Sequence, residues 1–520
     1  MKITKYDLVL SVISGVLFPI AFVIPYAGIL SWFLLIPFFT SIGNKSPWGA
    51  FRLGVLTGTI ANAIGAYWLI GTLSRFGGFP LLVSLIFHLA ISIYSGLPFA
   101  IFAYITTRLG LFGKHGLFSA LLIAAVWTSV EFLFPFLFPY GIASSEINYL
   151  PLIQIFDLLG RYSLSFLIVL VNVALMRLIV RLLNHRLAPV LDVLTSFILL
   201  IFVIGYGFWR IGVETEKIGE ARKITVGIVQ ANVDIFEKKQ KNEKTISEKH
   251  RVMSYALNSP DLIIWPETAV QAWIPASAHF LSDNGELIIP QTRGSYFLVG
   301  GLSYKVNKIN PDGIPDEKDI DKFNTAFLTD AQGRILGRYN KVKLLLFGEY
   351  LPFAKYIPAL KGISPASGDF TPGNELDVLE IKEKGIKIAP LICYEDIIPS
   401  FSRRFVSKGA NLLVNITNDA WFGKSFEPYQ HLSFSIPSAV ETRRFLIRAT
   451  NTGISAIVDP VGRVVAKTEV FERTTLNGKV GIIDGDKTLY TKIGDVFPWG
   501  CLVFWLGFAV VARLRRKNPA

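Results

Sequence analysis

The sequence predicts an α+β membrane protein in which eight transmembrane helices carry a mixed α/β domain outside the cytoplasm. Three observations predict it. Hydrophobic residues make up 51% and charged residues 18% of the 520 residues, with a mean hydropathy of +0.45, whereas about 25% charged residues is usual in a soluble protein. Long apolar runs occupy 1–210 and 489–520, while 211–488 alternates between strand-like and helix-like stretches. Lysine and arginine cluster beside the apolar runs.

The apolar runs account for eight spans. Residues 8–44 contain no charged side chain, and such a stretch is too long for one membrane helix but long enough for two. Pro25 and Gly28 supply a turn near its middle. The six further runs lie at about 53–74, 79–107, 117–139, 162–183, 189–209 and 491–512. Seven helices are therefore expected before residue 211 and one at the end.

The net charge of +13 belongs mainly to the membrane segments. Residues 1–210 and 489–520 hold 17 Lys/Arg against 6 Asp/Glu, whereas 211–488 holds 35 against 33. This distribution indicates membrane orientation and argues against a nucleic-acid partner. With the N-terminus inside, thirteen Lys/Arg fall in the inside loops and two, Arg75 and Arg161, in the short outside loops. The bias predicts both termini in the cytoplasm and 211–488 on the opposite side.

Residues 211–488 have the pattern of a separate domain. Short strand-like runs lie at 224–233, 261–267, 295–304, 325–330, 333–341, 386–396 and 411–419. Helix-like stretches lie at about 244–257, 398–408 and 430–448. Strands mixed with helices favour a layered α/β fold. We therefore divide the chain into a membrane domain (1–210), an α/β domain (211–488) and an eighth span with a basic cytoplasmic tail (489–520).

Three segments of the α/β domain carry candidate catalytic side chains. Glu267 follows the run IIWP, Lys341 follows RYN, and Cys393 follows IAPLI. A thiol attacks a carbonyl as the thiolate, a carboxylate can take its proton, and a lysine ammonium favours the anionic states. Taken singly, each residue has an ordinary explanation, as a helix cap, a surface lysine and a buried thiol. Taken together, they indicate covalent catalysis through a cysteine.

These segments resemble the nitrilase superfamily, whose Glu–Lys–Cys triad occurs in this chain order on an αββα sandwich. More narrowly, the whole chain resembles the bacterial apolipoprotein N-acyltransferases. The matching stretches are WPET (265–268), YNK (339–341), FGEYLPF (347–353), ICYED (392–396), NITNDAWFG (415–423), PYQH (428–431) and RATNTGISAIVD (448–459). Seven spans, a nitrilase-like domain and an eighth span agree with that family.

The resemblance implies roles for six residues. Cys393 corresponds to the nucleophile, Glu267 to the general base and Lys341 to the residue that stabilises the oxyanion. Three more, Glu349, Tyr394 and Glu395, match positions that support or gate the site. Two departures stand out. Residues 343–346 (KLLL) replace the family's usual His-Leu-Val-Pro, and Lys239 stands where the family often has a tryptophan.

The resemblance also implies the reaction and the partners. An acyl chain passes from a membrane phospholipid to the cysteine as a thioester. It then passes to the α-amine of the S-diacylglyceryl-cysteine at an apolipoprotein's N-terminus. We expect a monomer in the bacterial inner membrane, with the catalytic domain in the periplasm. No cofactor or metal is expected, and two cysteines with six scattered histidines offer no close-spaced metal motif.

Two other functions stay open from the sequence. A membrane-tethered nitrilase-type amidase would release ammonia from a small amide. A transporter would need paired charges or broken helices within its spans, and the sequence offers Glu131, as an intramembrane site or a hydrated helix end. Residues 344–347 and 421–422 are candidates for an acyl groove, or ordinary core. Cys501, inside the last run, is expected to be inert.

Overall fold

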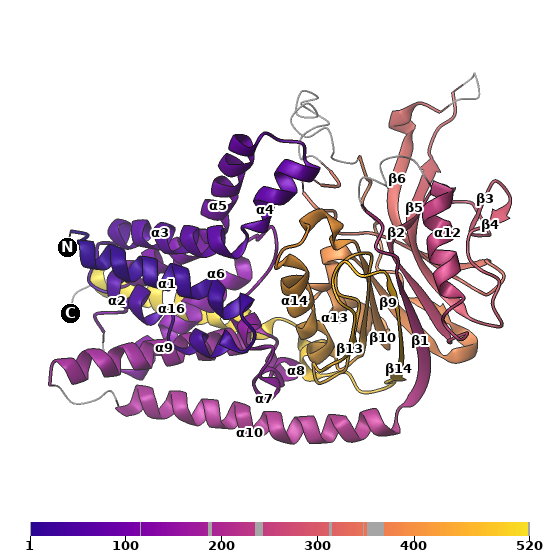
Figure 1. Cartoon of the computed structure of the whole chain (residues 1–520). Coiled ribbons are helices and arrows are strands. Elements are labelled where there is room, and N and C mark those ends of the chain that lie inside the picture. The colour runs from indigo at the N-terminus through magenta and orange to yellow at the C-terminus, as the bar shows by residue number, and fades with distance from the viewer. Residues whose placement is uncertain are drawn as a thin grey trace. The chain divides into compact units, whose positions relative to one another are not determined.

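The computed structural model of the chain describes residues 2–114, 116–185, 190–234, 243–310, 315–346, 348–350 and 369–517. It divides into two units, whose elements are labelled in Figure 1. The helical unit comprises Met1–Ile70, Pro80–Val213 and Thr488–Ala520, and the sandwich unit comprises Gly71–Phe79 and Glu214–Lys487. The six candidate site residues all lie in the sandwich unit.

The helical unit consists of helices of very different lengths. They are α1 (Lys5–Val23), η1 (Ala27–Trp32), α2 (Ile36–Ile42), α3 (Pro47–Gly65), α4 (Trp68–Gly71), α5 (Leu81–Arg108), α6 (Leu117–Leu133), η3 (Ile142–Glu146), α7 (Leu150–Ile153), α8 (Phe156–Leu159), α9 (Tyr162–Leu183), α10 (Val190–Glu220), α15 (Leu489–Ile493) and α16 (Val496–Lys517). Thr4 and Ser46 cap α1 and α3 by accepting from backbone N–H groups of the first turn.

The apolar helices support a membrane protein, although not every expected span is one long helix. Among the described residues, α1, α5, α9, α10 and α16 are each long and apolar enough to cross a membrane. A sixth crossing would join α3 to Trp68–Arg75 with a bend of 59°. The other two runs form shorter apolar helices, within Ala27–Ile42 and Leu117–Leu133. Pro25 precedes the first of these and Pro135 follows the second. Proline favours helix ends, although Pro19 and Pro98 lie within α1 and α5.

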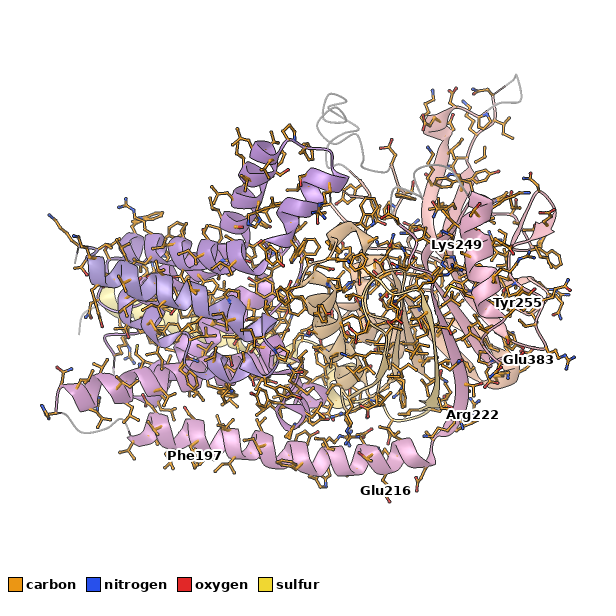
Figure 2. The ribbon with its side chains drawn as sticks, in the orientation of Figure 1. Phe197, Glu216, Arg222, Lys249, Tyr255 and Glu383 are labelled. Atoms are coloured by element: carbon orange, nitrogen blue, oxygen red, sulfur yellow. The ribbon has the colours of Figure 1, made fainter. Side chains whose placement is uncertain are left out.

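The run expected at 189–209 forms α10, a helix of 31 residues that continues to Glu220. Figure 2 labels Phe197 in its apolar first half and Glu216 near its end. Phe197 is exposed, as expected for a side chain that faces lipid. The helix extends beyond the end of the apolar run, and Glu216 and Lys217 in this extension are good helix formers. Through α10 the chain passes from the helical unit to the first strand of the sandwich unit.

The described part of the sandwich unit contains two six-stranded sheets, ordered β14-β1-β2-β5-β6-β7 and β13-β12-β11-β10-β9-β8. The first comprises β1 (Arg222–Gln230), β2 (Leu262–Pro275), β5 (Tyr296–Val306), β6 (Ile320–Thr329), β7 (Ile335–Asn340) and β14 (Thr474–Ile482). The second comprises β8 (Leu379–Ile381), β9 (Ile386–Ile392), β10 (Leu412–Thr417), β11 (Leu446–Thr450), β12 (Ala456–Val458) and β13 (Val464–Lys467). A small hairpin joins β3 (Ser282–Asp283) to β4 (Glu286–Leu287).

The two sheets stack face to face, because β1 and β2 of the first contact β10 and β11 of the second. Helix α12 (Glu243–Ser254) packs on the first sheet, whereas α13 (Phe401–Ser407) and α14 (Glu427–Thr442) pack with the second (Figure 1). This is a nitrilase-like αββα order. Strands β9, β10 and β11 run parallel. Their carboxyl ends therefore bring residues 393, 418 and 451 to one edge of the sheet.

Each predicted strand overlaps a strand of the structure, although β2 and β6 extend well beyond the predicted bounds, and one predicted helix ends in the wrong place. The helix expected to reach residue 448 stops at Thr442. Arg443 takes a φ of 52°, which ends the helix, and Leu446–Thr450 forms β11. This five-residue strand is too short for periodicity to separate it from the end of a helix.

Candidate active site

Glu267 lies in an irregular part of β2. Where β2 pairs with β5, four residues of β2 (266–269) face a single residue of β5, Gly300. A Cβ on Gly300 would lie 2.3 Å from the carbonyl oxygen of Pro266, so glycine is needed for this close approach. The extra residues of β2 form a bulge, a feature that redirects side chains beside functional sites.

Lys341 directly follows β7, and its buried ammonium lies between two carboxylates. Its Nζ is 2.8 Å from Oε2 of Glu349 and 3.6 Å from Oε1 of Glu267. Its backbone N–H donates to the carbonyl of Asn324 on β6. Burial acts to lower the pKa of Lys341, but the negative charges of Glu349 and Glu267, and that of Cys393 whenever its thiol is ionised, raise this pKa well above its usual value. Lys341 is therefore an ammonium at neutral pH.

Asn324, which sequence reasoning did not single out, joins the two carboxylates. Its Nδ2 donates to Oε1 of Glu267 at 2.7 Å and to Oε1 of Glu349 at 3.0 Å. The other oxygen of Glu349 pairs with Lys341 and accepts from the N–H of Leu345 at 2.8 Å. Both oxygens of Glu349 are thus engaged, which suits it to hold Lys341. The available signal was the position of Asn324, a polar residue directly before the strand-like run 325–330.

Cys393 begins η7 (Cys393–Asp396), directly after β9. Its φ of 55° lies in the left-handed region, which residues other than glycine rarely adopt and which recurs at functional sites. Asn415 on β10 holds the turn, because its Nδ2 donates to the carbonyl of Cys393 at 2.8 Å and to that of Leu391 at 3.2 Å. Sequence reasoning did not single out Asn415 either, although this asparagine lies between the apolar pairs of the strand-like run 411–419.

Glu395 fastens the loop after β7 to the end of β9. Its Oε1 accepts from the hydroxyl of Tyr339 and from the N–H groups of Val342 and Lys343, each at 2.9 Å. Its Oε2 accepts from Tyr339 at 3.0 Å and from the N–H of Ile392 at 2.9 Å. Burial raises the pKa of Glu395 to about 7, against the opposing effect of these donors. Glu395 is thus an internal anchor between two segments of the site.

Tyr394 covers Lys341. The Nζ of Lys341 lies 5.7 Å from the centroid of the Tyr394 ring, within the range of a cation–π contact. The hydroxyl of Tyr394 donates to the carbonyl of Leu344 at 3.0 Å. Burial raises the pKa of Tyr394, so its hydroxyl stays protonated at neutral pH. The ring therefore shields the ammonium without adding a charge.

The surroundings of Cys393 favour a protonated thiol at rest. The residue is partly exposed, yet protein atoms surround the thiol, and this desolvation raises the pKa of Cys393 well above its usual value. The Lys341 ammonium opposes the rise, whereas the carboxylates of Glu267, Glu349 and Asp419 add to it. A thiol in this state needs a neighbouring base to take its proton as it attacks.

A second buried cluster has side chains of the kinds that bind metals. Asp419, Glu427 and His431 place ligand atoms within 4.8 Å of one another. Both ring nitrogens of His431 already face carboxylates, Nδ1 facing Asp419 at 3.0 Å and Nε2 facing Asp396 at 3.1 Å. Arg448 forms an ion pair with Asp396. Side chains of the cluster supply its positive charge, so the arrangement does not require a cation.

Two further residues singled out from the sequence lie in the helical unit. Glu131 of α6 accepts from Trp127 Nε1 at 3.0 Å, from the N–H of Ile142 at 3.1 Å and from Ser165 Oγ at 2.6 Å. It thereby fastens η3 and α9 to α6. Cys501 is buried in α16. Both have the environment of structural residues.

The candidate acyl-groove residues differ in exposure. Leu344 is buried, and residues 345 and 346 are half-buried. Residue 347 lies outside the described residues. Trp421 of η8 (Asp419–Phe422) is 38% exposed, and Phe422 is half-buried. Their assignment to an acyl groove stays a prediction.

Comparison with known proteins identifies the class first. A family model described as carbon-nitrogen hydrolase matches residues 225–482. With the sandwich and its grouped glutamate, lysine and cysteine, this match defines an enzyme domain of the carbon-nitrogen hydrolase type, in a chain that also carries several apolar helices. A solved amidase of the nitrilase superfamily from Nesterenkonia is similar at 20% identity and a TM-score of 0.35, covering 52% of this chain and 93% of its own.

The helical part and the full-length relatives identify the family. A model described as the apolipoprotein N-acyltransferase N-terminal domain matches residues 14–174. The apolipoprotein N-acyltransferase of Geobacter metallireducens is 36% identical, covering 99% of this chain and 97% of its own length. That of Bdellovibrio bacteriovorus is 31% identical, covering 91% and 87%. The chain belongs to the apolipoprotein N-acyltransferase family.

Proposed function

We propose that this enzyme transfers an acyl chain from a membrane phospholipid, through a thioester on Cys393, to the α-amine of the S-diacylglyceryl-cysteine of an apolipoprotein. The observation that carries the proposal is the buried group of Glu267, Lys341 and Glu349, whose charges act on Cys393 at its left-handed turn. Membership of the family over the whole chain supports it. Both substrates are lipid-anchored, so a site held at a bilayer gains from their restricted approach.

The first half-reaction forms the thioester. Cys393 attacks the ester carbonyl while Glu267 takes the thiol proton. The Lys341 ammonium and backbone N–H groups at the Cys393 turn stabilise the oxyanion. Glu267 then gives the proton to the departing alkoxide, so the ester bond breaks and a lysophospholipid leaves.

The second half-reaction restores the enzyme. The free α-amine of the acceptor attacks the thioester carbonyl, and Glu267 takes a proton from the attacking nitrogen. The carbon–sulfur bond breaks, an amide remains on the acceptor, and the proton returns to the thiolate of Cys393. Glu349 and Tyr394 hold and shield Lys341, and Glu395 keeps the two segments of the site together.

The test is a labelled donor supplied without an acceptor. Given a phospholipid with a radioactive acyl chain, the wild-type enzyme is expected to gain one acyl group and to release a lysophospholipid, because a ping-pong enzyme stops at the covalent intermediate. Neutral hydroxylamine should remove the label, since it cleaves thioesters and leaves amides intact. A diacylglyceryl peptide with a free N-terminal amine should discharge the enzyme, whereas the same peptide with a blocked amine should not.

The same experiment separates the alternatives. A nitrilase-type amidase would release ammonia from a small amide and would not accept the phospholipid's acyl chain. A transporter would carry no label on Cys393. Either result would contradict acyl transfer.

We further propose that the chain crosses the bacterial inner membrane eight times, with both termini in the cytoplasm and 211–488 in the periplasm as the catalytic domain. The charge distribution supports this, with thirteen Lys/Arg in the inside loops against two outside. The crossings are the six formed by long or bent helices and the two shorter apolar segments, Ala27–Ile42 and Leu117–Leu133. We propose that the enzyme acts as a monomer. Besides the phospholipid donor and the apolipoprotein acceptor, its partner is the lipid bilayer.

A reporter fused after Arg516 is expected to read as cytoplasmic, because the basic end of α16 should stay inside. A reporter inserted at Gly285, in the exposed turn between β3 and β4, should read as periplasmic. Asp312, an equivalent insertion point by sequence, lies outside the described residues. Reporters reading on the same side would overturn the proposed orientation.

A further inference from the structure

The buried cluster behind Cys393 joins four elements of the sandwich unit. His431 lies on α14, Asp396 ends η7, Asp419 begins η8, and Arg448 lies on β11. All four are buried, as is Glu427 at the start of α14. The proposed catalytic mechanism uses none of them. Because η7 begins with Cys393, the cluster is attached directly to the turn that carries the proposed nucleophile.

The geometry requires His431 to donate from both ring nitrogens. Nδ1 lies 3.0 Å from Oδ1 of Asp419 and Nε2 lies 3.1 Å from Oδ1 of Asp396. Ionised carboxylates only accept hydrogen bonds, so the ring between them is an imidazolium. Burial and Arg448 act to lower the pKa of His431, but Asp396 and Asp419 raise it to about 10. The charge is therefore kept through the neutral range.

The charges within the cluster balance. Arg448 pairs with Asp396, which leaves the imidazolium as the nearest positive charge for Asp419. Burial and the charge of Asp419 raise the pKa of Glu427 well above its usual value, which favours its neutral form. Asp419 is also among the groups that raise the pKa of the Cys393 thiol. Without His431, its charge would act on the thiol more strongly.

We propose that His431 is a positioning residue for Cys393: its imidazolium ties Asp396 on η7 to Asp419 on η8 and cancels the carboxylate charge behind the thiol. The inference rests on the proposed function only in taking Cys393 as the nucleophile. It assigns a role to a histidine that lies outside the glutamate–lysine–cysteine group. The groups that face His431 are Asp396, Asp419, Glu427 and Arg448, and they come from every element of the cluster.

The test measures how fast iodoacetamide alkylates Cys393 as a function of pH. The full-length enzyme is used in detergent with the Cys501→Ser change, so that Cys393 is its single thiol. His431→Gln removes the positive charge, and the apparent pKa of the thiol should rise by about one unit, slowing alkylation at neutral pH about tenfold. Asp419→Asn removes the opposing charge and should shift the pKa the other way. The double variant should return close to the parent.

The opposite signs separate charge compensation from simple packing. A purely structural role for His431 would slow or speed alkylation in both single variants alike, and the double variant would be worse than either. That result, or a His431→Gln enzyme with an unchanged pH profile, would overturn the inference. If His431→Gln does not fold, the direction of the pKa shift in Asp419→Asn still decides, because a rise or no shift there would overturn the inference. Alkylation needs no lipid, so an enzyme that shows these shifts but never forms an acyl thioester would refute the proposed function alone.

Discussion

Cys393→Ser is expected to reduce acyl transfer by about three orders of magnitude or more. A hydroxyl is far less acidic than a thiol, and the single ammonium of Lys341 is unable to make up the difference. The left-handed turn and the hydrogen bond from Asn415 to the carbonyl of residue 393 do not involve the sulfur, so the turn should survive the change. The measurements are turnover with a diacylglyceryl peptide and the amount of label retained from a radioactive phospholipid.

Cys501→Ser is the matched control. It makes the same chemical change in a buried thiol of α16, and turnover should stay close to that of the wild type. Transfer by a wild-type enzyme that never carries label would mean direct passage from donor to acceptor, and the covalent mechanism would then be wrong. Equal losses in both serine variants would point to a general sensitivity of the fold.

Glu267→Gln is expected to slow thioester formation by about two to four orders of magnitude, the usual contribution of a general base. The amide keeps the size of the carboxylate, and its oxygen can still accept from Nδ2 of Asn324. It is unable to take the proton of a thiol whose pKa is raised well above its usual value. The measurement is the single-turnover rate of acyl-enzyme formation.

Two variants make this result specific. Glu286→Gln changes an exposed glutamate of the same unit, on β4, and should leave the rate unchanged. Glu349→Gln should weaken the hold on Lys341, because Oε2 of Glu349 lies 2.8 Å from Nζ. If acylation stays near normal in Glu267→Gln and collapses in Glu349→Gln, the base is Glu349 and the roles of the two carboxylates are exchanged.

The strands beside Glu267, Lys341 and Cys393 could be located from the sequence because each candidate lies within or at the end of a short strand-like run. The helix expected at 430–448 shows the limit of this reasoning. Leu446–Thr450 is short enough to fit either the end of a helix or a strand, and the backbone of Arg443 decided the outcome. The apolar runs show the same limit of sequence-based prediction, since a bend of 59° follows α3 inside one continuous apolar run.

The supporting residues of the site could not be predicted in the same way. Asn324 lies 57 residues from Glu267 in the chain, and the two meet only when β6 and β2 take their places on either side of β5. Asn415 reaches the Cys393 turn from the neighbouring strand. A hydrogen bond depends on a separation of about 3 Å and on direction, and a linear pattern of residue types contains neither.

The sequence by itself determined which reactive groups this protein has: a thiol, carboxylates and an ammonium in short strand-like segments, and that they accompany apolar helices. These properties belong to residue types and to short contiguous motifs. Only the tertiary structure decided the positions and hydrogen-bond partners of the three carboxylates around the candidate site. It placed Glu267 in a bulge of β2, engaged both oxygens of Glu349, and made Glu395 an anchor with donors from two segments. The physical reason is that burial, charge and hydrogen bonding act through distances between residues far apart in the chain, and packing alone sets those distances.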